Sequence, residues 1–272
     1  MSPQYTVHTT PEAQEAGAVA LAVASLPATF GPARSEADAD VRVIAGQSGW
    51  TSQAMEAIDA GARGIIVVNP VTESVSELEQ AAYAHGTAIV LDQRWATNPA
   101  VPGAESAIRD MVGRVVLLDS VATASAGSDS RVLLIDQLAA VVRLTGPLEN
   151  FRLLNQGTRG YTVSAQLANG APATLQGILS SARPAGLEIS LISDDGGARV
   201  TLPEPVAAWP AKVAVSGPQG ELLLPTLYES AHRATWRRLA DHLESDTPAR
   251  DLSVFSQLAA DLSNLTSHLV HN

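Results

Sequence analysis

The feature that most constrains the fold is the stretch 60–101, in which two short apolar runs flank a helical pattern. The runs, residues 64–68 and 87–91, have the length of strands, and residues 75–84 between them read as a helix. Strands that are buried on both faces are continuously apolar, and a helix between two of them is the usual crossover of a parallel pair. The stretch therefore predicts a strand–helix–strand unit of a parallel sheet.

The same alternation extends to both sides of this stretch. Further strands are predicted at residues 5–9, 41–45 and 114–121, and further helices at residues 11–25, 51–60 and 103–112. Thr10 and Pro11 have the residue types of an N-cap and a first helical position, and residues 28–40 form a connector that contains Pro, Gly and Asp. Residues 1–121 are therefore predicted to form an α/β domain with a parallel sheet.

Beyond residue 121 the pattern changes to strands that are separated by turns. A loop at 122–130 and a helix at 132–145 precede strands predicted at 151–155, 161–167, 174–180, 187–192, 199–202, 213–215 and 221–224. Short turns such as Asn169-Gly170 favour antiparallel pairing. Two helices follow, the last of them amphipathic. Residues 122–272 are thus predicted to form an α+β domain with a large, mostly antiparallel open sheet, and its C-terminal helices could pack back on the first domain.

Charge and composition exclude several classes of function. The net charge is −11 and Lys212 is the only lysine, which argues against nucleic acid or an anionic membrane as a partner. The absence of cysteine excludes disulfides and thiolate chemistry, and the histidine spacing predicts no metal site. The N-terminus lacks the pattern of a signal peptide, and no apolar segment has the length of a membrane span. We therefore expect a soluble cytoplasmic protein.

Three segments resemble the Gfo/Idh/MocA oxidoreductases. In residues 60–101 a strand ends at Asn69-Pro70, where the family has a Glu-Lys-Pro triplet, and a second strand leads to a polar loop. Residues 111–115 (MVGRV) resemble the family's entry into its second domain, and residues 144–155 (LTGPLENFRLLN) resemble its link from helix to sheet. The resemblance implies a truncated Rossmann-like domain followed by an open sheet, and NAD or NADP as cofactor. It also implies a homo-oligomer, or pairing with a paralogous subunit, through the open sheet.

The sequence departs from this family at three functional motifs. Asn69 replaces the lysine that lies beside the nicotinamide in the family, and an amide has no proton to transfer near neutral pH. The turn Thr10-Pro11-Glu12-Ala13 lacks the glycines of a pyrophosphate turn, and no GxGxxG occurs elsewhere. Counting back from Gly146 places Asp136 and Ala139 where the family has its acid–base pair.

The catalytic and cofactor-binding candidates follow from these positions. Asn69 and Asp136 stand at the catalytic positions of the family. A carboxylate with apolar neighbours, such as Asp136, is typical of a site residue with a raised pKa, or else it faces solvent on an amphipathic helix. Asn69 either orients a ligand oxygen or caps the strand end. The cofactor-binding candidates are Gly46, Ser48, Gly49 and Pro70, although Gly46–Gly49 is also compatible with an ordinary strand-to-helix turn.

The substrate-binding candidates follow the strand 87–91 and recur on a late helix. They are Asp92, Gln93, Arg94, Trp95, Tyr228 and His232. Ligands of open α/β sheets bind at the carboxyl ends of the strands, where Arg94 suits an anionic group and Trp95 suits a sugar face. The alternatives are an interdomain salt bridge for Arg94, a core position for Trp95, and a stripe on the late helix that packs domains together.

Two functional hypotheses follow, with a third that is purely structural. Because three motifs fail together, the sequence favours a degenerate, noncatalytic protein that binds a small sugar-like ligand or a partner subunit. The alternative is an NAD(P)-dependent oxidoreductase that acts on a sugar, a polyol or a related hydroxyl or carbonyl substrate through a shortened cofactor site. In the third, the chain exists mainly to pair with itself or with an active paralogue.

Overall fold

The computed structural model describes residues 4–204, 208–245 and 247–267, and it divides the chain into two compact units. The first unit comprises Met1–Gln93 and Ala231–Ala259, and the second comprises Arg94–Ser230 and Ala260–Asn272. Residues 94–121, which the sequence pattern assigned to the first domain, thus belong to the second unit, because helix α5 (Val101–Val112) packs against α6 (Ser130–Thr145). Helix α7 (Ala231–Ser245) returns to the first unit.

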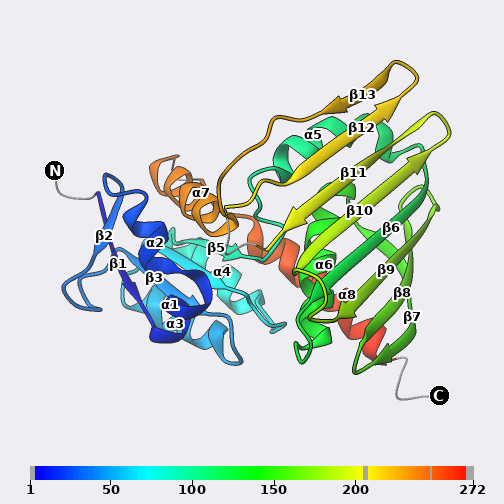
Figure 1. The fold of residues 1–272 in the computed structure, drawn as a ribbon. Helices are drawn as coiled ribbons and strands as arrows, with labels where there is room; N and C mark the ends of the chain where they lie inside the picture. The colour runs from blue at the N-terminus through cyan, green and yellow to red at the C-terminus, as the bar shows by residue number, and fades with distance from the viewer. Residues whose placement is uncertain (1–3, 205–207, 246, 268–272) are drawn as a thin grey trace. The chain divides into compact units, whose positions relative to one another are not determined.

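The first unit is built on a five-stranded parallel sheet with the order β2-β1-β3-β4-β5 (Figure 1). Its strands are β1 (Tyr5–Thr9), β2 (Phe30–Pro32), β3 (Val41–Ala45), β4 (Gly64–Val68) and β5 (Ala88–Asp92). Every residue of β3, β4 and β5 is buried, as continuous apolar runs in a doubly covered sheet require. The predicted bounds of β1, β3 and β4 are confirmed. Strand β2 lies within the predicted connector; it was missed because only Phe30 gives its three residues an apolar signal.

Helices cover both faces of this sheet. One face carries α1 (Pro11–Gly17), α2 (Val19–Ala24) and α7, whose buried side chains share one apolar cluster with β1, β3 and β4. Helices α3 (Trp50–Asp59) and α4 (Ser76–His85) contribute no residue to that cluster and pack on each other. The predicted single helix 11–25 is wrong, because Ala18 adopts a left-handed conformation with φ 47° and separates α1 from α2.

The edge strand β5 is closed by side chains of the C-terminal helices. Asp251, the first residue of α8 (Asp251–Ser267), accepts a hydrogen bond from the Leu91 backbone N–H at 2.8 Å. Arg238 of α7 donates to the Leu91 carbonyl at 3.1 Å and pairs with Asp251 at 2.7 Å. An open strand edge is a template for pairing with another chain, and these contacts occupy both backbone groups of Leu91 at this edge. They also explain why α7 and the start of α8 belong to the first unit.

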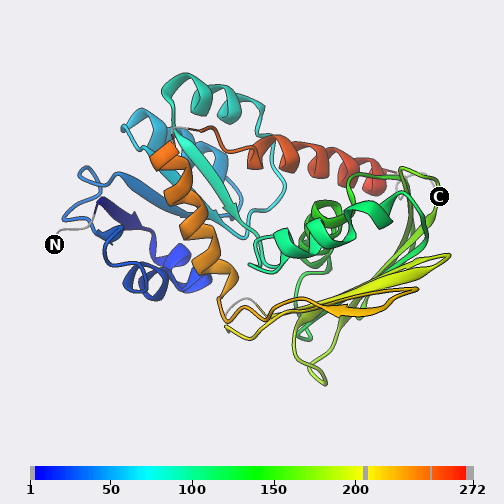
Figure 2. The ribbon, with the colours of Figure 1, turned by 90° about the horizontal axis from the view of Figure 1, so that it is seen from above.

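The second unit is an eight-stranded sheet with the order β13-β12-β11-β10-β6-β9-β8-β7 (Figure 1). Its strands are β6 (Val115–Ala124), β7 (Leu148–Gly157), β8 (Gly160–Leu167), β9 (Pro172–Leu179), β10 (Gly186–Ser193), β11 (Gly196–Pro203), β12 (Lys212–Gly217) and β13 (Gly220–Leu223). Within this sheet β6 and β9 pair in parallel, and the other described pairs are antiparallel. Helices α5 and α6 lie on one face (Figure 2). Hydrophobic side chains such as Val116, Ile178 and Ile192 are exposed.

Candidate functional site

A buried carboxylate–imidazole pair lies at the carboxyl end of β5. The Nδ1 atom of His232 lies 2.6 Å from Oδ2 of Asp92, and the Thr235 hydroxyl donates to Oδ1 of Asp92 at 3.1 Å. Asp92 is 1% exposed and His232 is 4% exposed. The carboxylate fixes the orientation of the imidazole ring. The structure thus brings together two predicted substrate-binding residues; Thr235 was not predicted, although it follows His232 by three positions on α7.

Gly46 directly follows β3 and makes a backbone contact that leaves no room for a side chain. Its N–H donates to the Val68 carbonyl and its carbonyl accepts from the Val71 N–H, both at 2.7 Å. A Cβ atom at Gly46 would lie 2.3 Å from the Pro70 Cα. Asn69, between those loops, has a φ of 51°, a left-handed conformation that Asn tolerates better than most residues. The backbone groups of Gly46 are therefore already used within the chain, and Pro70 forms the wall against which Gly46 packs.

The N-terminus of α3, where Ser48 and Gly49 were predicted to meet a cofactor, is capped by Glu73. The Gly49 N–H donates a short hydrogen bond to Oε1 of Glu73. Oε2 of the same carboxylate accepts from the Thr51 N–H at 3.2 Å and from the Thr51 hydroxyl at 2.8 Å. Helix N-termini bind anions through such free N–H groups. Here the anion is the side chain of Glu73 from the protein itself. No sequence pattern predicted this role for Glu73.

The N-terminus of α1 is closed in a similar way. The Thr10 hydroxyl accepts a hydrogen bond from the Ala13 N–H at 3.2 Å, Pro11 has no N–H to donate, and Glu12 adds a negative charge to the first turn. A pyrophosphate held by a helix N-terminus needs free donors and no competing carboxylate. The residues at the N-termini of α1 and α3 therefore do not fit a dinucleotide bound in the usual way.

The second unit holds a buried carboxyl group with an unusual pKa. Asp136 on α6 is 6% exposed, and burial raises its pKa from 3.8 to about 7. The positive charge of Arg94 opposes this rise, and the negative charge of Glu204 adds to it. Arg94 and Glu204 form an ion pair at 2.8 Å. The solvent-facing alternative for Asp136 is therefore excluded, and a carboxyl group that titrates near neutral pH can both donate and accept a proton.

A polar chain next to Asp136 fixes α6 on the sheet. The Tyr161 hydroxyl donates to Oε1 of Gln137 at 2.6 Å, and Nε2 of Gln137 donates to the Ser120 hydroxyl at 2.8 Å. All three side chains are buried. Burial, and secondly the charge of Asp136, raise the pKa of Tyr161 well above 10.0. Because α6 cannot rotate without breaking these bonds, they hold Asp136 in place.

The other predicted substrate-binding residues are placed less favourably. Trp95 is 0% exposed, with the Arg94 guanidinium 5.4 Å from its ring centroid, so it has the core position rather than an open stacking face. Gln93 is the last residue of the first unit's N-terminal segment. Tyr228 belongs to the second unit and is 77% exposed, whereas His232 belongs to the first unit.

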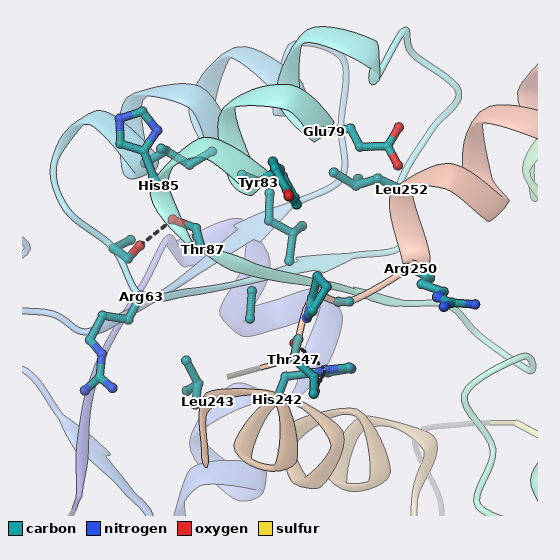
Figure 3. Close-up of a pocket in the computed structure, with 18 of the residues that line it drawn as sticks. Arg63, Glu79, Tyr83, His85, Thr87, His242, Leu243, Thr247, Arg250 and Leu252 are labelled. Carbon is teal, nitrogen blue, oxygen red and sulfur yellow. Dashed lines mark hydrogen bonds between the residues drawn. The ribbon is translucent and has the colours of Figure 1, made fainter. Parts of the chain in front are cut away.

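A cavity of about 650 Å³ lies at the edge of the first sheet formed by the amino ends of its strands, opposite the edge that holds Asp92 and Gly46. It opens between the end of α4, the amino ends of β4 and β5, and the connection from α7 to α8 (Figure 3). Arg63, His85, His242 and Arg250 are among its lining residues, and Nδ1 of His242 lies 3.0 Å from the Thr247 carbonyl. None of the predicted site residues lines this cavity.

The described residues contain neither a metal-binding cluster nor a membrane-spanning helix. Within residues 4–204, 208–245 and 247–267, no group of three or more His, Asp or Glu side chains is arranged to hold a metal ion. Over the same residues, no helix combines the length and the apolar character that a membrane span requires.

The sequence matches no family model and no curated protein. The fold is similar to that of UDP-N-acetylglucosamine 3-dehydrogenase GnnA from Acidithiobacillus ferrooxidans, with 15% identity, coverage of 94% of this chain and 87% of that chain, and a TM-score of 0.66. It is also similar to KijD10, a 3-ketoreductase from Actinomadura kijaniata in complex with NADP, with 14% identity, coverage of 94% of this chain and 86% of that chain, and a TM-score of 0.67. For the dehydrogenase MviM from Clostridium difficile, the identity is 11%, the coverage is 97% of this chain and 99% of that chain, and the TM-score is 0.67. These likenesses confirm the predicted fold class, a Rossmann-like unit with a larger mixed sheet, as in the Gfo/Idh/MocA fold.

Proposed function

We propose that this chain is an oxidoreductase of the sugar and polyol class, in which Asp136 exchanges a proton with a hydroxyl or carbonyl oxygen of the substrate. The observation that carries the proposal is a carboxyl group that titrates near pH 7, on the helix that leads into the sheet, in a fold shared with sugar dehydrogenases and ketoreductases. Matching the pKa of a general acid–base group to the working pH maximises proton transfer.

The residues around Asp136 support this role. When the carboxylate is ionised, it can accept the proton of a substrate hydroxyl; when it is protonated, it can return one to a carbonyl oxygen. Arg94 can hold an oxygen of the substrate by hydrogen bonds if its pair with Glu204 opens on that side. By analogy with KijD10, the redox partner that we propose is NAD or NADP, bound weakly because the N-termini of α1 and α3 are already engaged within the chain.

A second candidate function is favoured by the closed helix N-termini. Glu73 at α3 and Thr10, Pro11 and Glu12 at α1 occupy or remove the donors on which a dinucleotide depends. In this case the chain binds a small sugar-like ligand, or a partner subunit, without turning it over.

We further propose that the open face of the second sheet pairs with a second copy or with a paralogous subunit, because hydrophobic side chains lie exposed on its strands.

One set of measurements separates the two candidates. Purified protein is incubated with UDP-N-acetylglucosamine and with free sugars and polyols, each with NAD or NADP, and nicotinamide reduction is followed by absorbance. The proposal expects turnover that Asp136→Asn lowers at least about a hundredfold, the usual size of a general acid–base contribution. The control Asp110→Asn changes an exposed acid of α5 and should leave the rate unchanged. Absence of turnover together with ligand-dependent thermal stabilisation of the protein would support the noncatalytic candidate.

A further inference from the structure

The carboxylate of Glu73 is bound as a ligand anion would be. It accepts three hydrogen bonds, from the N–H groups of Gly49 and Thr51 and from the Thr51 hydroxyl. The α3 helix begins at Trp50, so these donors belong to its first turn, where the helix dipole also favours negative charge. Glu73 reaches this position from the loop between β4 and α4.

The location of this contact gives it a functional meaning. In the sheet order β2-β1-β3-β4-β5, β2 is added on one side of β1 and β3–β5 on the other, so the strand order reverses between β1 and β3. Ligands of open α/β sheets bind in the crevice at such a switch point, outside the carboxyl ends of the strands. Gly46 and the turn into α3 follow β3 at this edge, and Thr10 and α1 follow β1. Both turns that could receive phosphate groups are therefore on one edge, and both are engaged by the chain's own groups.

We infer that Glu73 is a specificity-determining residue, which stands in for a ligand phosphate at the N-terminus of α3 and weakens the binding of phosphate-bearing ligands at this edge. A phosphate would have to displace the carboxylate from its three donors, and a bound phosphate beside the displaced carboxylate would be repelled. The edge therefore favours ligands that carry no negative charge where they meet α3. This inference rests on the proposed function only in taking a nicotinamide dinucleotide as the phosphate-bearing ligand to be tested.

The experiment measures how the full-length protein binds inorganic pyrophosphate and NADPH, each by titration calorimetry at low ionic strength. Glu73→Ala removes the internal anion, and Glu73→Gln keeps the size of the side chain but removes its charge. The matched control is Glu77→Ala, which changes an exposed acid in the first turn of α4 and makes the same change in net charge. We expect Glu73→Ala to bind both probes at least about tenfold more tightly than the wild type, with a smaller gain for Glu73→Gln and none for Glu77→Ala.

Two results would overturn the inference. One is a wild-type protein that binds either probe as tightly as Glu73→Ala does. The other is a folded Glu73→Ala protein with no gain in affinity. If Glu73→Ala does not fold, as circular dichroism would show, the same comparison is decided by Glu73→Gln. A gain in affinity without turnover of any sugar or polyol would contradict the proposed oxidoreductase activity and leave the role of Glu73 intact.

Discussion

Replacing Asp136 by Asn should make the second unit more stable, and the gain should depend on pH. Burial raises the pKa of this carboxyl group from 3.8 to about 7 in the folded chain. The folded state then holds the proton more tightly than the unfolded state does. Its favourable contribution is therefore complete below about pH 4 and is lost as the pH rises to about 7. Above that range the folded chain must keep a buried carboxylate ionised.

The structure sets the size of this effect. One pKa unit corresponds to 1.36 kcal/mol, so a rise from 3.8 to about 7 corresponds to about 4 kcal/mol of unfolding free energy. An Asn side chain has nearly the same shape and no charge. The stability of Asp136→Asn relative to the wild type should therefore grow from near zero at pH 4 to about 4 kcal/mol at pH 8.

Urea unfolding measured at pH 4, 6 and 8 tests this expectation. The difference between Asp136→Asn and wild type isolates one group from all the other carboxylates that titrate in the same range. Asp110→Asn, at an exposed position of α5, is the matched control and should differ from the wild type by a constant amount. A difference that stays constant with pH for Asp136→Asn as well would refute the argument that burial has raised this pKa.

Three further substitutions test other parts of the structure. His232→Ala should cost about 2–3 kcal/mol in urea unfolding, because the buried Asp92 carboxylate loses a hydrogen-bond partner. Gly46→Ala should lower the free energy of unfolding by about 1–3 kcal/mol, because the added Cβ has no space. At Gly113 an added Cβ meets nothing within 4 Å, so Gly113→Ala should be nearly neutral. Equal losses of stability in the two variants would contradict the close approach at Gly46. Ile192→Lys, at an exposed strand position, should reduce self-association in sedimentation velocity, and a wild-type chain that is monomeric at high concentration would contradict the proposed pairing of sheets.

The strands of the parallel sheet could be predicted from the sequence because they are buried on both faces. Strands β1, β3 and β4 have the predicted bounds, because their residues form apolar runs with polar or glycine residues at the ends. Strand β2 was missed, since three residues are too few for a pattern and its place beside β1 is set by the pairing of the backbones. The break at Ala18 was missed for a similar reason: Gly17 lies so close to Val68 that a Cβ there would be 2.9 Å from a methyl group, a tertiary constraint.

The candidate site was only partly readable. The apolar neighbours of Asp136 in the sequence were compatible with a buried site residue and with a solvent-facing position on an amphipathic helix. The structure shows that it is buried, because α6 is buried along most of its length, where a typical helix has one polar face. The pairing of Asp92 with His232 spans 140 residues and carries no periodic signal, although each was singled out by itself. Glu73 could not be found at all, because a loop carboxylate becomes a helix cap only when the chain's course brings it to the helix.

The missing glycine turn and the position of Glu73 have one physical cause in common. A helix N-terminus leaves backbone N–H groups unpaired, and burying them without a partner costs free energy. In a protein that always holds a phosphate ligand, the ligand satisfies those groups, and the empty site is less stable. Here Thr10 satisfies one donor of α1, Pro11 removes another, and Glu73 satisfies two of α3. The first unit can therefore fold to completion without a bound anion. A dinucleotide would then add little to the stability of the chain. The thermal shift that NADPH causes in the full-length protein should therefore be smaller for the wild type than for Glu73→Ala, and equal shifts would contradict this account.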